Sequence, residues 1–242
     1  SKGLPSSNGM MLAFSAKTGE TVAILRDEGW LTDMRTAIGG ALATRALART
    51  DATKVLIIGT GIQARFQAIC LAQLMPERVL NFRVWGRNFG AAQTAANELL
   101  SQELTVKAVL ELEDEVSSAD IIITTTPAVS PLFSDGLVRT GTHVTAIGAD
   151  SPGKQELPVG LVTSASLRVC DLLRQSLNHG EFQAAKLADP SLDVTELGHI
   201  LSGMHPGRRS KDDITVVDLT GIAAQDIAIT QAIIDAAASK KT

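Results

Sequence analysis

The chain has 242 residues, of which 45% are hydrophobic and 20% charged, and its formal net charge is −4. This is enough apolar chain to bury a core, and the charge gives no reason to expect nucleic acid or a membrane surface as a partner. The sequence contains no tyrosine, which excludes the dehydrogenase classes that use a tyrosine–lysine pair as proton donor.

The first part of the chain predicts a hairpin followed by a helix. Short apolar runs at 10–16 and 21–25, separated by a turn sequence, are typical of a β-hairpin. The helix is expected to begin with Thr32 as its N-cap and Asp33 in its first turn, and to end near Arg49.

From residue 51 onward, short apolar runs alternate with helical stretches. Strands are predicted at 54–59, 81–85, 106–110, 120–126, 143–147, 167–170 and 214–219, and helices at 62–75, 88–102, 113–119 and 222–238. The run from Val55 to Ile58 is continuously apolar, as in a strand that is buried on both faces. This order predicts an α/β fold, with a doubly wound parallel sheet and right-handed crossovers.

The final helix is expected to pack back on the hairpin and the first helix. We therefore predict a smaller, discontinuous α+β domain at 1–50 plus 222–242, and a nucleotide-binding domain at 51–221. Cys70 and Cys170 lie in apolar runs and are predicted to be buried thiols of a cytoplasmic protein, with a disulfide as the alternative. Neither the cysteines nor the histidines have metal-ligand spacing, so no metal site is predicted.

A glycine-containing turn joins the predicted strand at 54–59 to the next helix. In such turns the first glycine permits a tight bend, the second lets the backbone approach a pyrophosphate, and a small third residue lets the helix pack on the strand. The amino end of the helix presents free N–H groups to the phosphates. An ordinary strand-to-helix turn is the alternative. The strand–turn–helix context predicts a dinucleotide site made by Gly59, Thr60, Gly61, Ile62, Gln63 and Ala64.

The ends of two further strands predict additional cofactor contacts. An NAD-specific site has an acidic residue after the second strand, but this chain has Arg87 and Asn88 there. A guanidinium pairs with a 2′-phosphate, so NADP(H) is the favoured cofactor. NAD(H) is the alternative if Arg87 is a solvated surface residue. Thr125 and Thr126 follow another strand, where they either contact the cofactor or satisfy backbone groups.

Four ordered segments together resemble the ornithine cyclodeaminase/μ-crystallin family. They are Leu31-Thr32-Asp33-Met34-Arg35-Thr36-Ala37, the turn at 57–64, Gly148-Ala149-Asp150-Ser151-Pro152-Gly153-Lys154-Gln155-Glu156-Leu157, and Asp218-Leu219-Thr220-Gly221-Ile222-Ala223-Ala224-Gln225-Asp226. The resemblance runs from about residue 3 to about residue 235. It implies a Rossmann-type domain joined to a smaller substrate and dimerisation domain, a homodimer, NAD(P)(H), and a small α-amino or α-imino acid substrate.

The residues themselves give the chemistry a physical basis. Arg35, in the first turn of its helix, can bind a substrate carboxylate, and the resemblance implies the same role. Asp150, on a loop after a sheet strand, is the predicted catalytic proton carrier. Gly221 is expected to lie close to the nicotinamide, with a plain turn glycine as the alternative. Lys154 and Glu156 share the Asp150 loop, where they either support the site or form a solvated pair.

The favoured function is an NAD(P)H-dependent oxidoreductase that acts on a small α-imino or α-amino acid. The Asp218–Gly221 motif and Ser151 resemble the reductase and ectoine-utilisation branches of the family. The alternatives are an ornithine cyclodeaminase and a non-catalytic dinucleotide-dependent binding protein. The resemblance also implies a substrate-directed lysine just upstream of the segment at Gly3-Leu4-Pro5. Lys2 does not match it by position, so the sequence resembles a family member that is shortened at its amino end.

Overall fold

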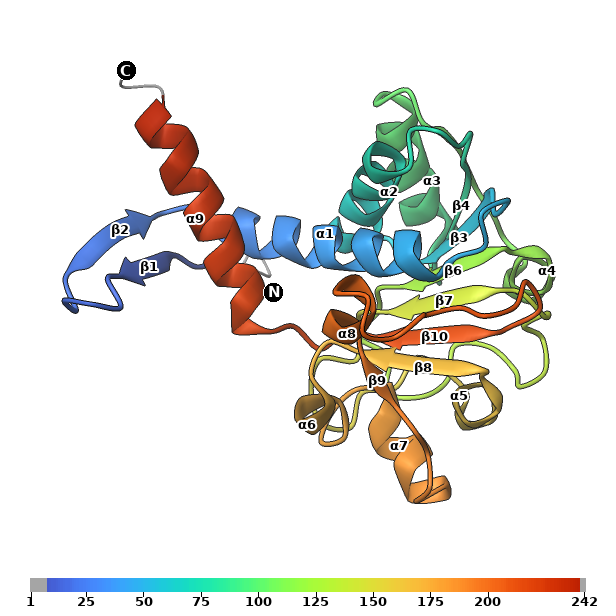
Figure 1. Ribbon diagram of the computed structural model, residues 1–242. Coiled ribbons are helices and arrows are strands. Elements are labelled where there is room, and N and C mark those ends of the chain that lie inside the picture. The colour runs from blue at the N-terminus through green and yellow to red at the C-terminus, as the bar shows by residue number, and fades with distance from the viewer. Residues whose placement is uncertain (1–7, 240–242) are drawn as a thin grey trace.

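The computed structural model describes residues 8–239, and its central element is one eight-stranded sheet (Figure 1). Every neighbouring pair of strands is parallel, and the order is β5-β4-β3-β6-β7-β10-β8-β9. The predicted doubly wound parallel sheet is therefore confirmed. The strands are β3 (Lys54–Ile58), β4 (Asn81–Trp85), β5 (Thr105–Ala108), β6 (Ile121–Thr124), β7 (His143–Ala146), β8 (Leu167–Cys170), β9 (Thr195–Glu196) and β10 (Thr215–Asp218).

Helices cover both faces of this sheet. The helices of the described residues are α1 (Trp30–Leu47), α2 (Ile62–Leu74), α3 (Phe89–Leu100), α4 (Leu112–Ser118), α5 (Val159–Ser164), α6 (Leu173–Ser176), α7 (Glu181–Ala188), α8 (Leu197–Leu201) and α9 (Ala223–Ser239). The last of them, α9, lies away from the sheet. Because side chains alternate along a strand, Val55 and Ile57 of β3 join one core with α1, α2 and α3. Leu56 and Ile58 join a second core with α4, α5 and α7. This two-sided burial is why β3 is apolar without interruption.

The strand order changes direction between β3 and β6. The chain runs from β3 outward to β4 and β5, and then returns to place β6 on the other side of β3. Crevices at the carboxyl ends of strands at such a switch point are where doubly wound sheets bind ligands. On that second side, β10 lies between β7 and β8, although it follows both in the sequence.

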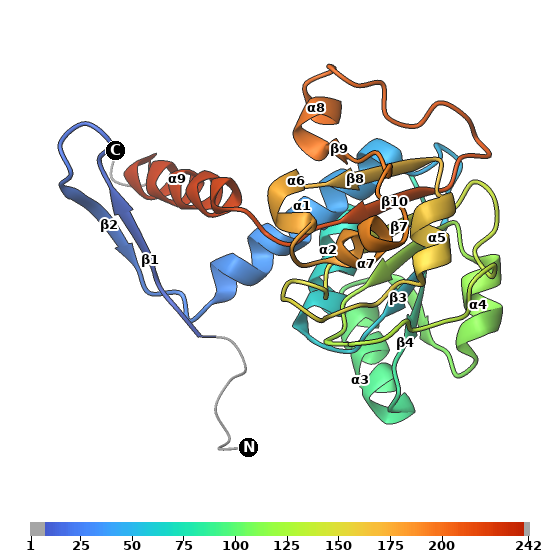
Figure 2. The ribbon, with the colours of Figure 1, turned by 90° about the horizontal axis from the view of Figure 1, so that it is seen from below.

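The hairpin and the last helix lie beside each other, away from the sheet. Strands β1 (Met11–Phe14) and β2 (Thr21–Leu25) pair antiparallel, and the hydroxyl of Thr230 in α9 donates to Sδ of Met11 over 3.3 Å. In both views α1 connects this part to the sheet (Figures 1 and 2). The expected packing of the last helix on the hairpin and on α1 is confirmed. Our division at residues 50 and 222 stays a prediction, and α1 contributes to both parts.

Three details differ from the sequence prediction or complete it. Thr32 is not the N-cap of α1, because the helix begins at Trp30 and the carboxylate of Asp27 accepts a hydrogen bond from the backbone N–H of Leu31 over 2.6 Å. Thr32 lies inside the helix, and its carbonyl accepts from the Thr36 hydroxyl. The short elements α5, α6, α7, α8 and β9 were not predicted. Cys70 and Cys170 are both free and buried, as expected.

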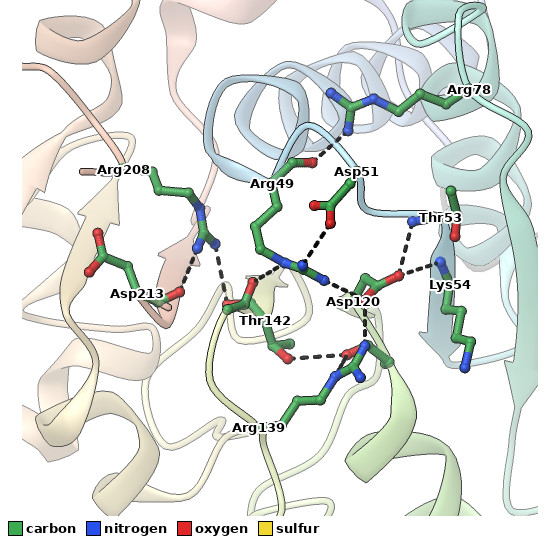
Figure 3. A network of polar contacts seen from close by, with 12 residues as sticks. Arg49, Asp51, Thr53, Lys54, Arg78, Asp120, Arg139, Thr142, Arg208 and Asp213 are labelled. Carbon is green, nitrogen blue, oxygen red and sulfur yellow. Dashed lines mark hydrogen bonds and ion pairs between the residues drawn. The ribbon is translucent and has the colours of Figure 1, made fainter. Parts of the chain in front are cut away.

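A polar network ties the amino ends of the strands together (Figure 3). Its centre is Asp120, which precedes β6 and accepts hydrogen bonds from the backbone N–H groups of Thr53 and Lys54 at 3.0 and 2.9 Å. The same carboxylate pairs with Arg49 at 2.6 Å and with Arg139. Burial opposes the ionised form, but these donors outweigh it and lower the pKa of Asp120. The network lies at the opposite end of the sheet from the switch-point crevice.

Candidate active site

The glycine turn after β3 fits closely against the end of β6. Gly59 has φ +136°, and a β-carbon there would lie 2.3 Å from Oγ1 of Thr125. Gly61 has open space in the direction of its missing side chain, with no atom within 4 Å of such a β-carbon. Gly61 is also the N-cap of α2 and provides no side-chain acceptor for the first turn. The first N–H groups of α2 therefore suit an anion such as a phosphate.

A cleft of about 540 Å³ opens beside this turn, at the carboxyl ends of β3, β4 and β6. It brings together six of the residues that we predicted from the sequence: Gly59, Thr60, Gly61, Arg87, Thr125 and Thr126. Its remaining lining comes from Trp85, Gly86 and the segment 127–132 that follows β6. Five predicted residues do not line this cleft, namely Ile62, Gln63, Ala64, Asn88 and Gly221. Of these, Ala64 is fully buried against the sheet, as its predicted packing role requires.

Arg65 is a residue of this turn that sequence reasoning missed. From the first turn of α2 its Nη1 donates to the carbonyl oxygens of Thr60 and Gly61, at 2.6 and 3.0 Å. Its Nε pairs with Glu98 of α3. Arg65 therefore fixes the turn from the helix side. Only its spacing of four and five residues from these two carbonyls could have indicated this contact.

Arg87 and Asn88, at the end of β4, differ in their surroundings. Arg87 is exposed at the cleft, and it has no hydrogen-bond or ion-pair partner within residues 8–239. The side-chain oxygen of Asn88 accepts from the backbone N–H of Ala91 over 3.1 Å and caps α3. The guanidinium of Arg87 is thus available to a ligand, whereas Asn88 has a structural role at the helix start.

Gln63 points away from the cleft and toward α1. Its Nε2 donates to the carbonyl oxygen and to Oδ1 of Asp33, at 3.0 and 3.2 Å. The side chain of Gln63 therefore connects the phosphate-turn helix to the first turn of the helix that carries Arg35.

Arg35 lies beside Gly221 and the start of α9. Its Nε pairs with Asp226 at 3.0 Å, and its Nη1 donates to Gln225, also at 3.0 Å. A β-carbon on Gly221 would lie 3.0 Å from Nη1. In the described part of the chain Nη2 makes no hydrogen bond. Arg35 lines a second, mostly apolar cavity of about 470 Å³ between α1, α8 and α9, separate from the dinucleotide cleft.

The Gly221 turn is held from β8. Asp171, directly after that strand, accepts a hydrogen bond from the backbone N–H of Gly221 at 2.7 Å and from the Thr220 hydroxyl at 3.1 Å. Gln175 donates to the carbonyl oxygen of Gly221 at 2.6 Å. Gly221 has φ +86°, a conformation that other residues rarely adopt.

Asp150 lies exposed on the loop after β7. Nζ of Lys154 lies 2.6 Å from Oδ1 of Asp150, and the Ser151 hydroxyl donates to the same oxygen at 3.1 Å. Lys154 therefore pairs with Asp150 and not with Glu156. An exposed carboxylate with one cationic neighbour can exchange protons with a ligand or with water.

Glu156 is fully buried behind this loop, in contrast to a solvated residue. Burial raises the pKa of Glu156, while hydrogen bonds from Thr126, Thr124 and Gly148 act in the opposite direction. Behind it lie two further buried carboxyls. Burial raises the pKa of Glu181 to about 8, and it raises the pKa of Asp218 well above its ordinary value. No local sequence pattern indicates these three buried carboxyl groups, because their contacts join segments that are far apart in the chain.

These features define a dinucleotide-binding protein of the Rossmann type, with a glycine turn and an anion-accepting helix end at the switch point of a parallel sheet. The model of the ornithine cyclodeaminase/mu-crystallin family matches residues 1–241. The chain belongs to this family, as its four motifs predicted. Within residues 8–239, no helix has both the length and the apolarity needed to cross a bilayer.

Similar proteins include one that is named as a dehydrogenase and one that is named as a cyclodeaminase. A putative dehydrogenase of Rhizobium meliloti is 41% identical over 94% of this chain and 69% of its own length. An uncharacterized cyclodeaminase of Sinorhizobium fredii is 39% identical, with the same coverage. Each of these proteins is therefore longer than the chain described here.

Solved structures agree with the fold over its whole length. An archaeal alanine dehydrogenase dimer with bound NAD has a TM-score of 0.90 and 32% identity, over all of this chain and 74% of that one. The Δ1-pyrroline-2-carboxylate reductase of Thermococcus litoralis, in complex with NADH and L-proline, has a TM-score of 0.89 and 28% identity, over all of this chain and 75% of that one. A nicotinamide dinucleotide is thus the class of cofactor that the similar structures hold.

Proposed function

We propose that the protein is an NAD(P)H-dependent oxidoreductase that reduces a small α-imino acid or oxidises the corresponding α-amino acid. The observation that carries this proposal is that two separate sites both lie at the carboxyl ends of the sheet strands. One is the dinucleotide cleft beside Gly59 and Gly61, and the other is the cationic group of Arg35 beside Gly221. Relatives named as a putative dehydrogenase, an alanine dehydrogenase and a Δ1-pyrroline-2-carboxylate reductase support this class of reaction.

The cofactor would be held by the open turn and by the ends of β4 and β6. The unpaired N–H groups at the start of α2 suit its pyrophosphate, and the walls formed by Thr125 and Thr126 suit its nicotinamide half. When bound, the nicotinamide supplies or accepts the hydride. We infer a preference for NADP(H), because Arg87 is exposed at the cleft without a partner among the described residues and a guanidinium binds a 2′-phosphate.

The remaining chemistry falls to two side chains. Arg35 would bind the substrate carboxylate through Nη2. Its Nη1 would bind the same carboxylate in place of Gln225, to which it now donates. Asp150, with Lys154 beside it, would deliver or remove the proton at the substrate nitrogen. Lys2 and the segment 3–5, next to which the family resemblance implies a substrate-directed lysine, lie outside the described residues.

Cofactor binding tests the first half of the proposal. Trp85 lines the cleft, so a bound dinucleotide should quench its fluorescence, and Trp30→Phe removes the only other tryptophan. In that background we expect NADPH to bind about tenfold more tightly than NADH, because one charged hydrogen bond contributes at least about 1.5 kcal/mol. Arg87→Ala should abolish the difference, and Arg45→Ala, at an exposed arginine on α1, should not. Equal affinities before the substitution would overturn the preference for NADP(H).

Turnover tests the second half. NADPH oxidation should be measured with Δ1-pyrroline-2-carboxylate, and with pyruvate plus ammonium. Consumption of NADPH with either substrate supports the reductase, whereas binding of the cofactor without any turnover overturns it in favour of a binding protein. The named cyclodeaminase relative supports a second candidate. Release of ammonia from ornithine in the presence of NAD, without net NADH, would identify that reaction.

We also infer a homodimer, formed through the hairpin and α9. More than half of the surface of several large apolar residues of the hairpin is exposed. They are Met10, which precedes β1, and Leu12, Phe14, Val22 and Ile24 on the two strands. Such contiguous apolar surface marks protein interfaces. The similar alanine dehydrogenase is a dimer. Light scattering should give twice the chain mass, and Leu12→Glu with Ile24→Glu should give the mass of one chain.

A further inference from the structure

Glu156 lies between the two loops that the proposed reaction needs. One is the loop after β6, which forms the cleft wall with Thr125 and Thr126, and the other is the loop after β7, which carries Asp150. Oε1 of Glu156 accepts from the backbone N–H of Thr126 at 2.6 Å and from its hydroxyl at 2.8 Å. Oε2 accepts from the backbone N–H of Gly148 at 2.7 Å and from the Thr124 hydroxyl at 2.8 Å.

The chemistry of this bridge requires a carboxylate. Each of the two oxygens accepts one backbone N–H, and these donors belong to different loops. A glutamine side chain has one acceptor oxygen and one NH₂ donor. Hydroxyl groups can rotate to accept from the NH₂, but the N–H of Thr126 and the N–H of Gly148 can only donate. A glutamine could therefore hold one loop and would leave a buried N–H of the other loop facing another donor.

The two loops also fit too closely to move independently. A β-carbon on Gly148 would lie 2.0 Å from the carbonyl oxygen of Thr126. Beyond the bridge, the N–H of Gln155 donates to the carbonyl oxygen of Ala128 at 3.0 Å, and Leu132 donates to that of Glu156 at 2.8 Å. The cleft wall and the Asp150 loop are thus one packed unit.

The bridge is itself anchored from α7. The carboxyl group of Glu181, the first residue of that helix, accepts from the backbone N–H groups of Glu156 and Leu157 at 2.7 and 2.9 Å. Glu181 is fully buried like Glu156. The position of Glu156 is therefore fixed from the opposite side to the cleft.

We propose that Glu156 is a positioning residue that fixes the dinucleotide-cleft wall and the Asp150 loop relative to each other. The catalytic part of this statement rests on the proposed function. Asp150 can meet a substrate held against the cofactor only if the loop after β7 keeps its place relative to the wall after β6. Glu156 does not line the cleft and acts through the backbone of Thr126 and Gly148.

The test compares Glu156→Gln with Thr124→Val in the full chain. The valine variant removes one buried hydrogen bond to the same carboxylate and leaves both backbone bridges in place. We expect Glu156→Gln to weaken NADPH binding and to lower kcat/KM by about tenfold to 100-fold, the loss that follows a displacement of about 1 Å. Thr124→Val should keep both values close to wild type, even where its melting temperature falls as much. The proposal would be overturned if both variants lost NADPH affinity and kcat/KM in the same proportion to the fall in their melting temperature.

Hydrogen exchange separates the positioning role from the reaction. In the wild-type protein the amides of Thr126 and Gly148 should be protected, and in Glu156→Gln at least one should lose its protection. If both stay protected, the proposal is wrong. The exchange result and the NADPH affinity test the positioning role of Glu156 even if the wild-type chain reduces no imino acid. That outcome would overturn only the proposed function. If Glu156→Gln does not fold, hydrogen exchange of the wild-type protein provides the test. A bridge that holds both loops together predicts equal opening free energies for the amides of Thr126 and Gly148, and unequal values would overturn the proposal.

Discussion

The guanidinium of Arg35 and the backbone of Gly221 lie so close that a β-carbon on the glycine would be 3.0 Å from Nη1. The helix after the hairpin and the turn after the central strand β10 meet at this point. A side chain on residue 221 must therefore displace the group that we propose to bind the substrate carboxylate.

Gly221→Ala should raise the substrate KM and leave NADPH affinity nearly unchanged. The alanine must adopt a φ of +86°, which costs about 1–2 kcal/mol, and it also pushes Arg35. Gly136→Ala is the matched control, because Gly136 has φ +81° and open space around its missing β-carbon. Steady-state kinetics should show the higher KM in the first variant only. The role assigned to Arg35 is wrong if the two variants behave alike.

Asp150→Asn should lower kcat by about 100-fold or more, the contribution of one positioned proton carrier. The fold and cofactor affinity should persist, because the Asp150 side chain is exposed and, within residues 8–239, its oxygens bond Lys154 and Ser151 alone. Ser151→Ala removes a hydrogen bond to the same oxygen and should change kcat far less. Single-turnover measurements with NADPH check both variants. Full activity of Asp150→Asn would show that another group, and not Asp150, carries the proton.

Asp120→Asn should lower the free energy of unfolding by about 2 kcal/mol, because Asp120 is buried and the substitution removes the charge that pairs with the partly exposed Arg49 and Arg139. The folded state lowers the pKa of Asp120, so its contribution is complete above about pH 4 and is lost as the pH falls further. The variant should therefore lose less stability on acidification than the wild type. Asp51→Asn, at an exposed partner of Arg49, should cost less than about 1 kcal/mol. Urea unfolding at pH 3 and pH 7 measures these differences.

Glu181 makes stability depend on pH in the opposite direction to Asp120. Its pKa is raised to about 8 in the folded protein, whereas an unfolded glutamate titrates near about 4.3. The folded state binds the extra proton, so stability should fall as the pH rises from about 5 to about 8. Glu181→Gln should flatten this fall, although the loss of one acceptor for Glu156 or Leu157 lowers stability at every pH. Thermal unfolding between pH 5 and pH 8 decides the matter, and an unchanged slope would refute the assignment.

The sequence predicted those parts of the fold whose signals are local. The continuous run from Val55 to Ile58 needs two covered faces, and the sheet provides them. The sequence analysis misses the helices of four to eight residues between 159 and 201, because they are too short to show a helical period. The insertion of β10 between β7 and β8 was also beyond prediction, since periodicity carries no information about strand order.

The same distinction holds for the candidate site. Gly59 and Gly61 were found because a tight turn needs glycine in a fixed order. Gln63 was assigned to the cofactor by its place in the motif, but its side chain bonds Asp33 of α1. The sequence leaves the role of Glu156 open, because its partners Thr124 and Thr126 lie about 30 residues earlier and meet it only after the sheet has formed.

The place of β10 also constrains how the chain can fold during synthesis. Strands β8 and β9 are synthesised before residues 215–218, yet both attach to the sheet only through β10. Until then β7 has an unpaired edge, and β8 is the nearest strand that could fill it wrongly. Correct assembly of this half of the sheet is therefore a late event, and a nascent chain that stalls before residue 215 exposes an edge that invites misfolding or aggregation.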